Sequence, residues 1–270
     1  MRVSSQQIFD AGIQALQKQT GDVVEYQRQI SSGQRYSKAS ESPLAAGLGV
    51  QVSMKRAVFT MHKVNQDYVN ASLTTTDTQL SSLQNMLARF QQMTVQAGND
   101  ALGADGRKQL GYQAQILINS VDKFANAKDA SGESVLKSVN GVSSVLVAPS
   151  IELDSALTYQ EVMGRTVVGT AEDPAATPAN VVGGRVDILT LLGKIKDNLV
   201  NGTGPAAQDV DDLQLALTQI SKAQAKTGVL QNELDAAVQS AETQKQNTEN
   251  NRASLLDTDL SEATSGFARA

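Results

Sequence analysis

Apolar residues recur every three or four positions over long stretches at both ends of the chain, and these stretches hold almost no proline. This spacing places the apolar side chains on one face of a helix, as in a coiled-coil seam. The pattern predicts helices over residues 4–31, 43–97, 107–127 and 185–200, and a last long helix that begins near Pro205. At 1.5 Å per residue the second helix would be roughly 80 Å long. The chain is therefore predicted to be mainly α: a long antiparallel helical rod, or coiled-coil-like bundle, formed by its N- and C-terminal segments.

The packing seam of this rod is predicted from heptad series. Within residues 43–97, apolar residues step by 4 and 3 in two series, and one extra residue near Thr76 separates them. Such a stutter locally unwinds a supercoil. A third series runs from Val210 to Ala241. The residues expected to pack the rod are Val58, Met61, Tyr68, Leu80, Leu83, Leu87, Phe90, Leu213, Leu217, Ile220, Leu234 and Val238.

The first helix carries a weaker seam, in which Thr20 and Gln27 occupy apolar positions. Gly12 and Gly21 each lower the stability of the helix by roughly 1 kcal/mol relative to Ala. Two interpretations remain open: a helix that needs a partner, and a frayed amphipathic helix at the N-terminus.

A polar connector separates the first two helices. Gly33 is suited to the left-handed backbone position that ends a helix. Ser42 is a good N-cap, and Pro43 is favoured at the first helical position. The second helix is therefore expected to begin at Pro43.

Residues 132–184 hold Val-rich, strand-like sequence and three of the five prolines. Residues 135–139 and 142–147 are typical of a β-hairpin about a type I′ turn at Asn140-Gly141. The residues that would supply further strands are Ile151, Leu153, Val162, Val167 and Val168. An irregular loop is the alternative.

The chain is thus expected to have three parts. Residues 1–42 form an N-terminal helix and its connector, and residues 43–131 with 185–270 form the helical rod. Residues 132–184 form a small β-rich insert at the tip of the rod.

Composition excludes several function classes. The chain has no cysteine, which rules out disulfides and zinc–thiolate sites. Its net charge is −5 without a Lys/Arg cluster, so nucleic acid is not an expected partner. It lacks about 18 consecutive apolar residues, the length needed to span a membrane. Its polar N-terminus does not resemble a cleavable signal peptide.

Catalytic, cofactor and metal sites are not predicted. The single histidine, His62, is expected to be a solvated or capping residue beside the seam. Asp257, Asp259 and Glu262 lack the glycine and ligand spacing of an EF-hand, so we expect a solvated or capping cluster. An enzyme therefore has no support from the residues.

Four segments resemble the flagellin superfamily: Ile30–Arg35, Ser40–Ala46, Ala97–Asn99 and Leu255–Glu262. Pro43 and the opening Met1–Ser4 are closer to the hook–filament junction branch of that superfamily than to filament flagellin. The resemblance covers residues 1–130 and 205–270, and the order and spacing of the segments make it specific.

This resemblance implies a structural subunit that joins hook to filament by packing of its terminal helices. It implies an inner-core assembly helix through Ile8, Phe9, Ile13, Leu16, Val23 and Ile30, and a signature loop of Ser32, Gly33, Arg35, Ser42 and Pro43. The implied partners are a second hook-associated junction protein, flagellin, and further copies of the chain in a ring. The resemblance also implies export through the flagellar channel without a cleaved signal and an extracellular location. It implies an export chaperone that binds the C-terminal part that family members have beyond residues 266–270.

The sequence departs from the family pattern in three places, one of which is the short insert at residues 132–184, which has no clear match among family members. The acidic pair expected before Pro43 is Glu41-Ser42. Family members continue past a stretch like residues 266–270 into one more helix, which pairs with the first. A truncated sequence is therefore expected, with a divergent family member as the alternative. Such a chain is expected to be soluble and not to polymerise, and its residues 1–35 are expected to be mobile or held by a lattice or neighbouring chain.

Two other functions remain as alternatives. A minor filament flagellin would stack laterally into long filaments. A coiled-coil adhesin would bind a ligand through residues 132–184.

Overall fold

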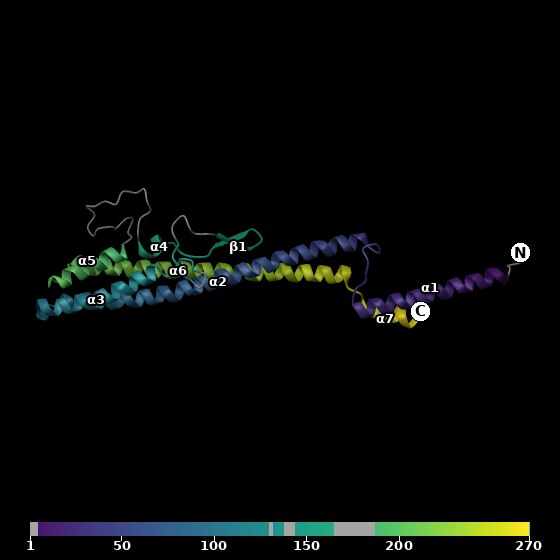
Figure 1. Ribbon diagram of the computed structural model, residues 1–270, viewed down its shortest axis with the longest axis horizontal. Helices are drawn as coiled ribbons and strands as arrows, with labels where there is room; N and C mark the ends of the chain where they lie inside the picture. Colours follow the sequence, from purple (N-terminus) through teal and green to yellow (C-terminus); the bar gives the residue numbers. More distant parts are fainter. Residues whose placement is uncertain (1–4, 130–131, 138–143, 165–186, 270) are drawn as a thin grey trace. The chain divides into compact units, whose positions relative to one another are not determined.

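The computed structural model describes residues 5–129, 132–137, 144–164 and 187–269 (Figure 1). These residues form a mainly α protein with one small antiparallel sheet. The helices are α1 (Ser5–Ser32), α2 (Pro43–Ala97), η1 (Asp100–Leu102), α3 (Gly103–Ala125), α4 (Tyr159–Met163), α5 (Ile188–Val200), α6 (Ala207–Leu256) and α7 (Leu260–Arg269). The strands are β1 (Ser144–Ala148) and β2 (Ile151–Asp154).

The chain divides into two compact units, residues 1–61 with 241–270 and residues 62–240. We call them the terminal unit and the central unit. Both α2 and α6 contribute residues to each. The long helices lie where the heptad pattern predicts them, and α2 begins at Pro43 as expected. The separate helix α7 was not predicted.

The buried seam of α2 in the central unit runs without a stutter. Its apolar members include Val69, Leu73, Leu80, Leu83, Leu87 and Phe90, all at most 1% exposed. Thr76 occupies the position between Leu73 and Leu80 and is also fully buried. Its hydroxyl donates to the carbonyl oxygen of Ser72, 2.9 Å away, so the buried polar group is satisfied within the helix.

The heptad frame predicted before Thr76 is therefore wrong. Val58, Met61 and Tyr68 are exposed, although they were expected to pack the rod. In the central unit the true frame continues back through Gln66 and His62, which are polar yet buried. A prediction that counts only apolar residues selects the neighbouring face of α2, because the buried face carries the polar residues Gln66 and His62.

On α6 the structure buries three of the five residues predicted to form the seam. Leu213, Ile220 and Leu234 are buried as expected, whereas Leu217 and Val238 are only half-buried. Small residues take several of the other buried positions, among them Ala216, Ala223 and Ala237. Alanine on the buried face allows close helix packing, and larger residues flank it.

In the central unit α2 and α6 are antiparallel. The amide of Gln91 donates to Gln214 at 3.2 Å, and that of Gln84 donates to Ser221 at 3.4 Å. Residue numbers thus rise along one helix as they fall along the other. This pairing confirms the antiparallel arrangement predicted for the terminal segments.

The hairpin differs from the predicted one. β1 pairs with β2, with Val145 opposite Leu153, and the turn contains Ser150 at a φ of +63°. Ile151 and Leu153 were predicted to be in a strand, and they are. Val162 lies in α4 and not in a strand. The predicted turn at residues 140–141, together with residues 167 and 168, lies outside the described residues.

Polar side chains of α2 form hydrogen bonds to the backbone of β1. Asn65 donates to the carbonyl oxygen of Leu146 at 2.8 Å, and Gln66 donates to that of Val147 at 2.7 Å. His62 Nδ1 lies 3.3 Å from the same Leu146 oxygen. The prediction of a solvated or capping histidine is therefore wrong. The hairpin lies beside α2 and not at the tip, because these residues sit well inside the helix (Figure 1).

A buried carboxylate at the start of α6 predicts a pH-dependent stability. Asp212 is 3% exposed, and its Oδ2 has no hydrogen-bond partner among the described residues. Its neighbour Asp209 instead pairs with Lys194 of α5 at 3.2 Å. Burial raises the pKa of Asp212 above its usual 3.8. The positive charge of Lys194 opposes this rise, and the nearby Asp209 and Asp211 add to it.

Because the pKa is raised on folding, the native state holds the proton more tightly than the unfolded state does. Stability should therefore fall as the pH rises from about 3.8 through the native pKa of Asp212. Asp212→Asn should stabilise the protein at pH 7, by less than about 2 kcal/mol since the amide also needs partners. Urea unfolding at pH 7 and pH 4 measures this. An equal gain at both pH values would contradict the explanation.

Candidate assembly site

The terminal unit presents an apolar face on α1. Phe9, Ile13 and Leu16 are 67, 40 and 65% exposed, whereas Val23 and Ile30 are half-buried. The side chain of Ile8 lies outside the described residues. The predicted assembly residues thus separate into an exposed group towards the N-terminus and a partly covered group towards the C-terminus of α1.

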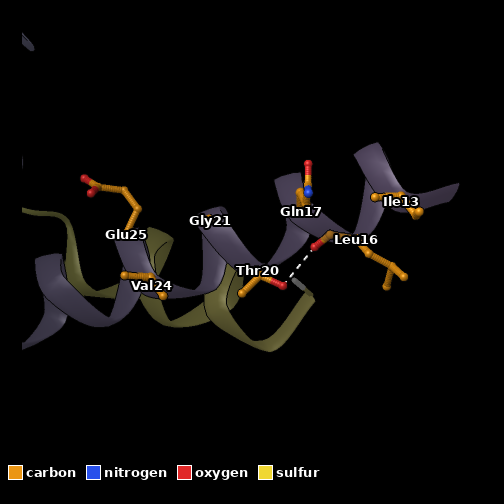
Figure 2. Close-up of a pocket in the computed structure, with 7 residues that line it drawn as sticks. All are labelled: Ile13, Leu16, Gln17, Thr20, Gly21, Val24 and Glu25. Atoms are coloured by element: carbon orange, nitrogen blue, oxygen red, sulfur yellow. Dashed lines mark hydrogen bonds between the residues drawn. The ribbon is translucent and has the colours of Figure 1, made fainter. Parts of the chain in front are cut away.

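A shallow groove follows this face. It is lined by Ile13, Leu16, Gln17, Thr20, Gly21, Val24 and Glu25, all from α1 (Figure 2). The hydroxyl of Thr20 donates to the carbonyl oxygen of Leu16 at 2.8 Å, so its methyl group is free to join the apolar surface. Gly21 leaves open space around its Cα. The groove can receive apolar side chains from another helix, since exposed apolar patches mark interaction surfaces.

The C-terminal part of α1 is covered by α7. A Cβ at position 266 would lie 2.5 Å from Cζ of Tyr26, so Gly266 permits the close approach of α7 to this ring. Ala263 of α7 is buried. Asp259 caps α7, accepting from the backbone N–H groups of Ser261 at 2.8 Å and Glu262 at 3.2 Å.

The acidic cluster near the C-terminus therefore serves local structure. Asp259 is a cap, as expected, and Asp257 pairs with Arg252 at 3.3 Å. The described residues contain no group of three or more acidic or histidine side chains suited to a metal ion. In the same part of the chain, no helix is both long and apolar enough to cross a membrane.

The two connectors of the terminal unit pair with each other. The backbone N–H of Arg35 donates to the carbonyl oxygen of Leu256 at 2.9 Å, and that of Thr258 donates to Gly33 at 3.0 Å. Gly33 has a φ of +67° and ends α1, as predicted. The hydroxyl of Ser42 accepts from the N–H of Ala45 at 3.2 Å, which confirms it as the cap of α2.

The signature loop therefore pairs the connector between α1 and α2 with the connector between α6 and α7. Ser32 Oγ also accepts from the N–H of Gln34 at 3.2 Å, so the polar residues of the loop serve its own backbone. No sequence pattern predicts this pairing, because the two connectors are far apart along the chain.

Charged side chains also form hydrogen bonds with this loop. Arg28 donates to Glu25 and, at 3.3 Å, to the carbonyl oxygen of Arg35. The hydrogen bonds from Arg28 and Gln29 lower the pKa of Glu25 to about 2. Backbone N–H groups of Ser37 and Lys38 donate to the Glu41 carboxylate and lower its pKa. Glu41 therefore stays ionised and organises the connector.

Arg56 of α2 pairs with Glu249 of α6 in the terminal unit, and this hydrogen bond lowers the pKa of Glu249. Arg252 approaches the same carboxylate at 3.4 Å. Ion pairs therefore join the two long helices where the apolar seam of α6 has ended. The sequence showed the polar character of this segment but not its partners.

Comparison with known proteins places these features in a family. Residues 3–141 match the bacterial flagellin N-terminal helical region, and residues 210–270 match the bacterial flagellin C-terminal helical region. The chain is similar to flagellar hook-associated protein 3 of Salmonella typhimurium, with 24% identity over 132 residues, or 49% of this chain. The match spans only 42% of that relative.

Flagellin of Bacillus subtilis is 23% identical over 254 residues, covering 89% of this chain and 82% of the relative. The crystal structure of the flagellar junction protein FlgL from Legionella pneumophila has a similar fold. Its TM-score is 0.55 at 16% sequence identity, and the alignment covers 79% of this chain and all of that chain. The family match to residues 3–141 covers more than half of the chain, which therefore belongs to the bacterial flagellin family.

Proposed function

We propose that the chain is a structural subunit of the bacterial flagellum that joins the hook to the filament. The observation that carries the proposal is the exposed apolar face of α1, which a flagellin-family chain would use to bind neighbouring subunits. The junction role is supported by the similarity to hook-associated protein 3 and by the fold shared with FlgL. The subunit acts by helix packing, without catalysis and without a cofactor or metal.

The proposal includes the partners and the location. A second hook-associated junction protein, flagellin, and further copies of the chain in a ring would contact the helices. The chain would leave the cell through the flagellar channel without a cleaved signal, assisted by an export chaperone, and act outside the cell. The division into an inner-core helix at residues 1–42, a rod and an outer insert at residues 132–184 is part of this proposal.

Motility tests the junction role. A strain lacking its hook–filament junction protein would express this chain, both as it stands and extended by the C-terminal helix of a family member. We expect swimming to be restored by at least the extended form. Leu16→Asp should abolish rescue, because it places a charge on the exposed face of α1, whereas Lys18→Asp on the opposite side of the helix should not. Immunoblots of the flagellar fraction establish export.

Filament flagellin is the second candidate, favoured by the match to Bacillus subtilis flagellin over 89% of the chain. Expression in a strain that lacks flagellin distinguishes the two. Long filaments built from this chain would establish the filament role. Motility rescue in the junction-deficient strain, without filaments in the flagellin-deficient strain, would establish the junction role.

A further inference from the structure

The buried seam of α2 begins with polar residues. Within residues 43–61 only Ala45 is buried, whereas from His62 onwards α2 buries a residue at every third or fourth position. The first two of these positions hold His62 and Gln66, which are 2 and 4% exposed. Neither contributes the apolar area that the mostly apolar positions from Val69 onwards bury. The apolar packing of α2 is therefore weakest where its solvent-exposed part meets the seam.

The polar residues at this end of the seam bind the backbone of β1. Gln66 donates to the carbonyl oxygen of Val147 at 2.7 Å, and Nδ1 of His62 lies 3.3 Å from that of Leu146. The half-buried Asn65 donates to the same Leu146 oxygen at 2.8 Å. A buried polar group without a partner destabilises the fold, so α2 and β1 each satisfy polar groups of the other.

A β-bulge presents β1 to α2. The pairing of β1 with β2 is irregular between Leu146 and Ala148, which makes Val147 an extra residue on β1. The extra residue of a bulge has no partner in the sheet. Its carbonyl group can therefore accept from Gln66, and its side chain is fully buried. The irregularity of the hairpin thus serves the contact with α2.

The same continuous segment reaches α6 at its other end. Residues 144–164 run from β1 through β2 to α4. In α4 the carbonyl oxygen of Val162 accepts from Gln219 of α6 at 2.9 Å, and Glu161 pairs with Lys226 of α6 at 2.6 Å. Gln219 is 8% exposed, so α6 also uses a buried polar side chain to bind the backbone of this segment. Residues 144–164 therefore connect α2 to α6 (Figure 1).

We propose that residues 144–164 act as a clamp that stops local unfolding of α2 at Gln66. The exposed residues 43–61 open readily, because local unfolding is easiest where few apolar groups are buried. Opening that passes Gln66 would break the hydrogen bonds to Leu146 and Val147 and the packing of the hairpin. The clamp thus keeps the apolar seam closed. It is a conformational device of the fold that goes beyond the proposed assembly function and does not depend on it.

Hydrogen–deuterium exchange of the purified chain, followed by mass spectrometry of its peptides, tests the clamp. Gln66→Met keeps an unbranched side chain of similar size but removes the donor to Val147. It also makes the seam more apolar, so a role in the seam alone predicts slower exchange of residues 62–73. The clamp predicts the opposite. Residues 62–73 and 144–154 should exchange about tenfold faster, equivalent to roughly 1.4 kcal/mol, because a buried carbonyl group loses its partner. Residues 80–97 should exchange as before.

Two matched controls accompany the variants. Gln92 is an exposed residue of the same helix, so Gln92→Met should leave all of these exchange rates unchanged. Asn65→Asp removes the donor to Leu146 and should accelerate exchange of the same two segments. Asn70→Asp makes the same change of charge at an exposed position of α2 and should not.

Three results would overturn the proposal. Unchanged or slower exchange of residues 62–73 in Gln66→Met would show that Gln66 is only a position of the seam. Faster exchange of residues 144–154 alone would show that the hairpin packs on α2 without keeping it closed. Equal acceleration of residues 80–97 would show a global loss of stability and not a local clamp. The assay needs only the purified chain, so its outcome is independent of the motility rescue that tests the junction role.

Discussion

Phe90→Ala is expected to lower the free energy of unfolding of the central unit by about 3–5 kcal/mol. Phe90 is 1% exposed and is among the largest fully buried side chains of the described residues. It lies on the continuous α2 seam, between Leu87 and Thr94. Replacement by alanine removes the transfer free energy of the ring and leaves a cavity, since two long helices can collapse only partly around it.

Val95→Ala is the matched control for that substitution. Val95 lies on the same helix and is 59% exposed, so its truncation should change stability by no more than about 0.5 kcal/mol. Urea unfolding followed by far-UV circular dichroism measures both variants. A similar effect of the two substitutions would show that the seam through Phe90 does not determine the stability of the unit.

The periodicity of the sequence predicted the existence of the long helices but not always the face that they bury. From Leu80 to Phe90 the apolar series and the buried face coincide, so the prediction was correct there. In the region of His62 and Gln66 the buried positions are polar and their side chains bind the backbone of β1. Periodicity cannot identify such positions, because their cost of burial is offset by a partner distant in sequence.

In the candidate assembly site, too, the sequence predicted features that depend on neighbouring residues but not contacts between residues far apart in the chain. Gly33 and Ser42 were predicted in their structural roles, because caps depend on residue type and near neighbours. The backbone hydrogen bond from Arg35 to Leu256 could be identified only from the structure. The apolar series that contains Val58 and Met61 was predicted from the sequence to form a packing seam of the rod. Its heptad spacing is real, but Val58 and Met61 are 44 and 47% exposed, so the spacing alone does not identify the buried face.

The second large effect is expected at the contact between α3 and α5. A Cβ at Gly111 of α3 would lie 2.8 Å from Cγ2 and 2.9 Å from the backbone nitrogen of Val200, and 3.2 Å from Cβ of Leu199. Backbone atoms cannot move aside as a flexible side chain does. Gly111→Ala therefore forces the two helices apart, at a cost of about 1–3 kcal/mol.

Helix propensity opposes this cost, since replacing glycine by alanine inside a helix stabilises it by about 1 kcal/mol. Gly193→Ala on α5 measures that gain alone, because a Cβ there would have no heavy atom within 4 Å. Gly193→Ala should raise the free energy of unfolding by up to about 1 kcal/mol, whereas Gly111→Ala should lower it or leave it unchanged. The difference between the two variants, about 1–3 kcal/mol by urea unfolding, isolates the steric term. Equal stabilisation by both substitutions would mean that α3 and α5 do not approach as closely as the structure has them.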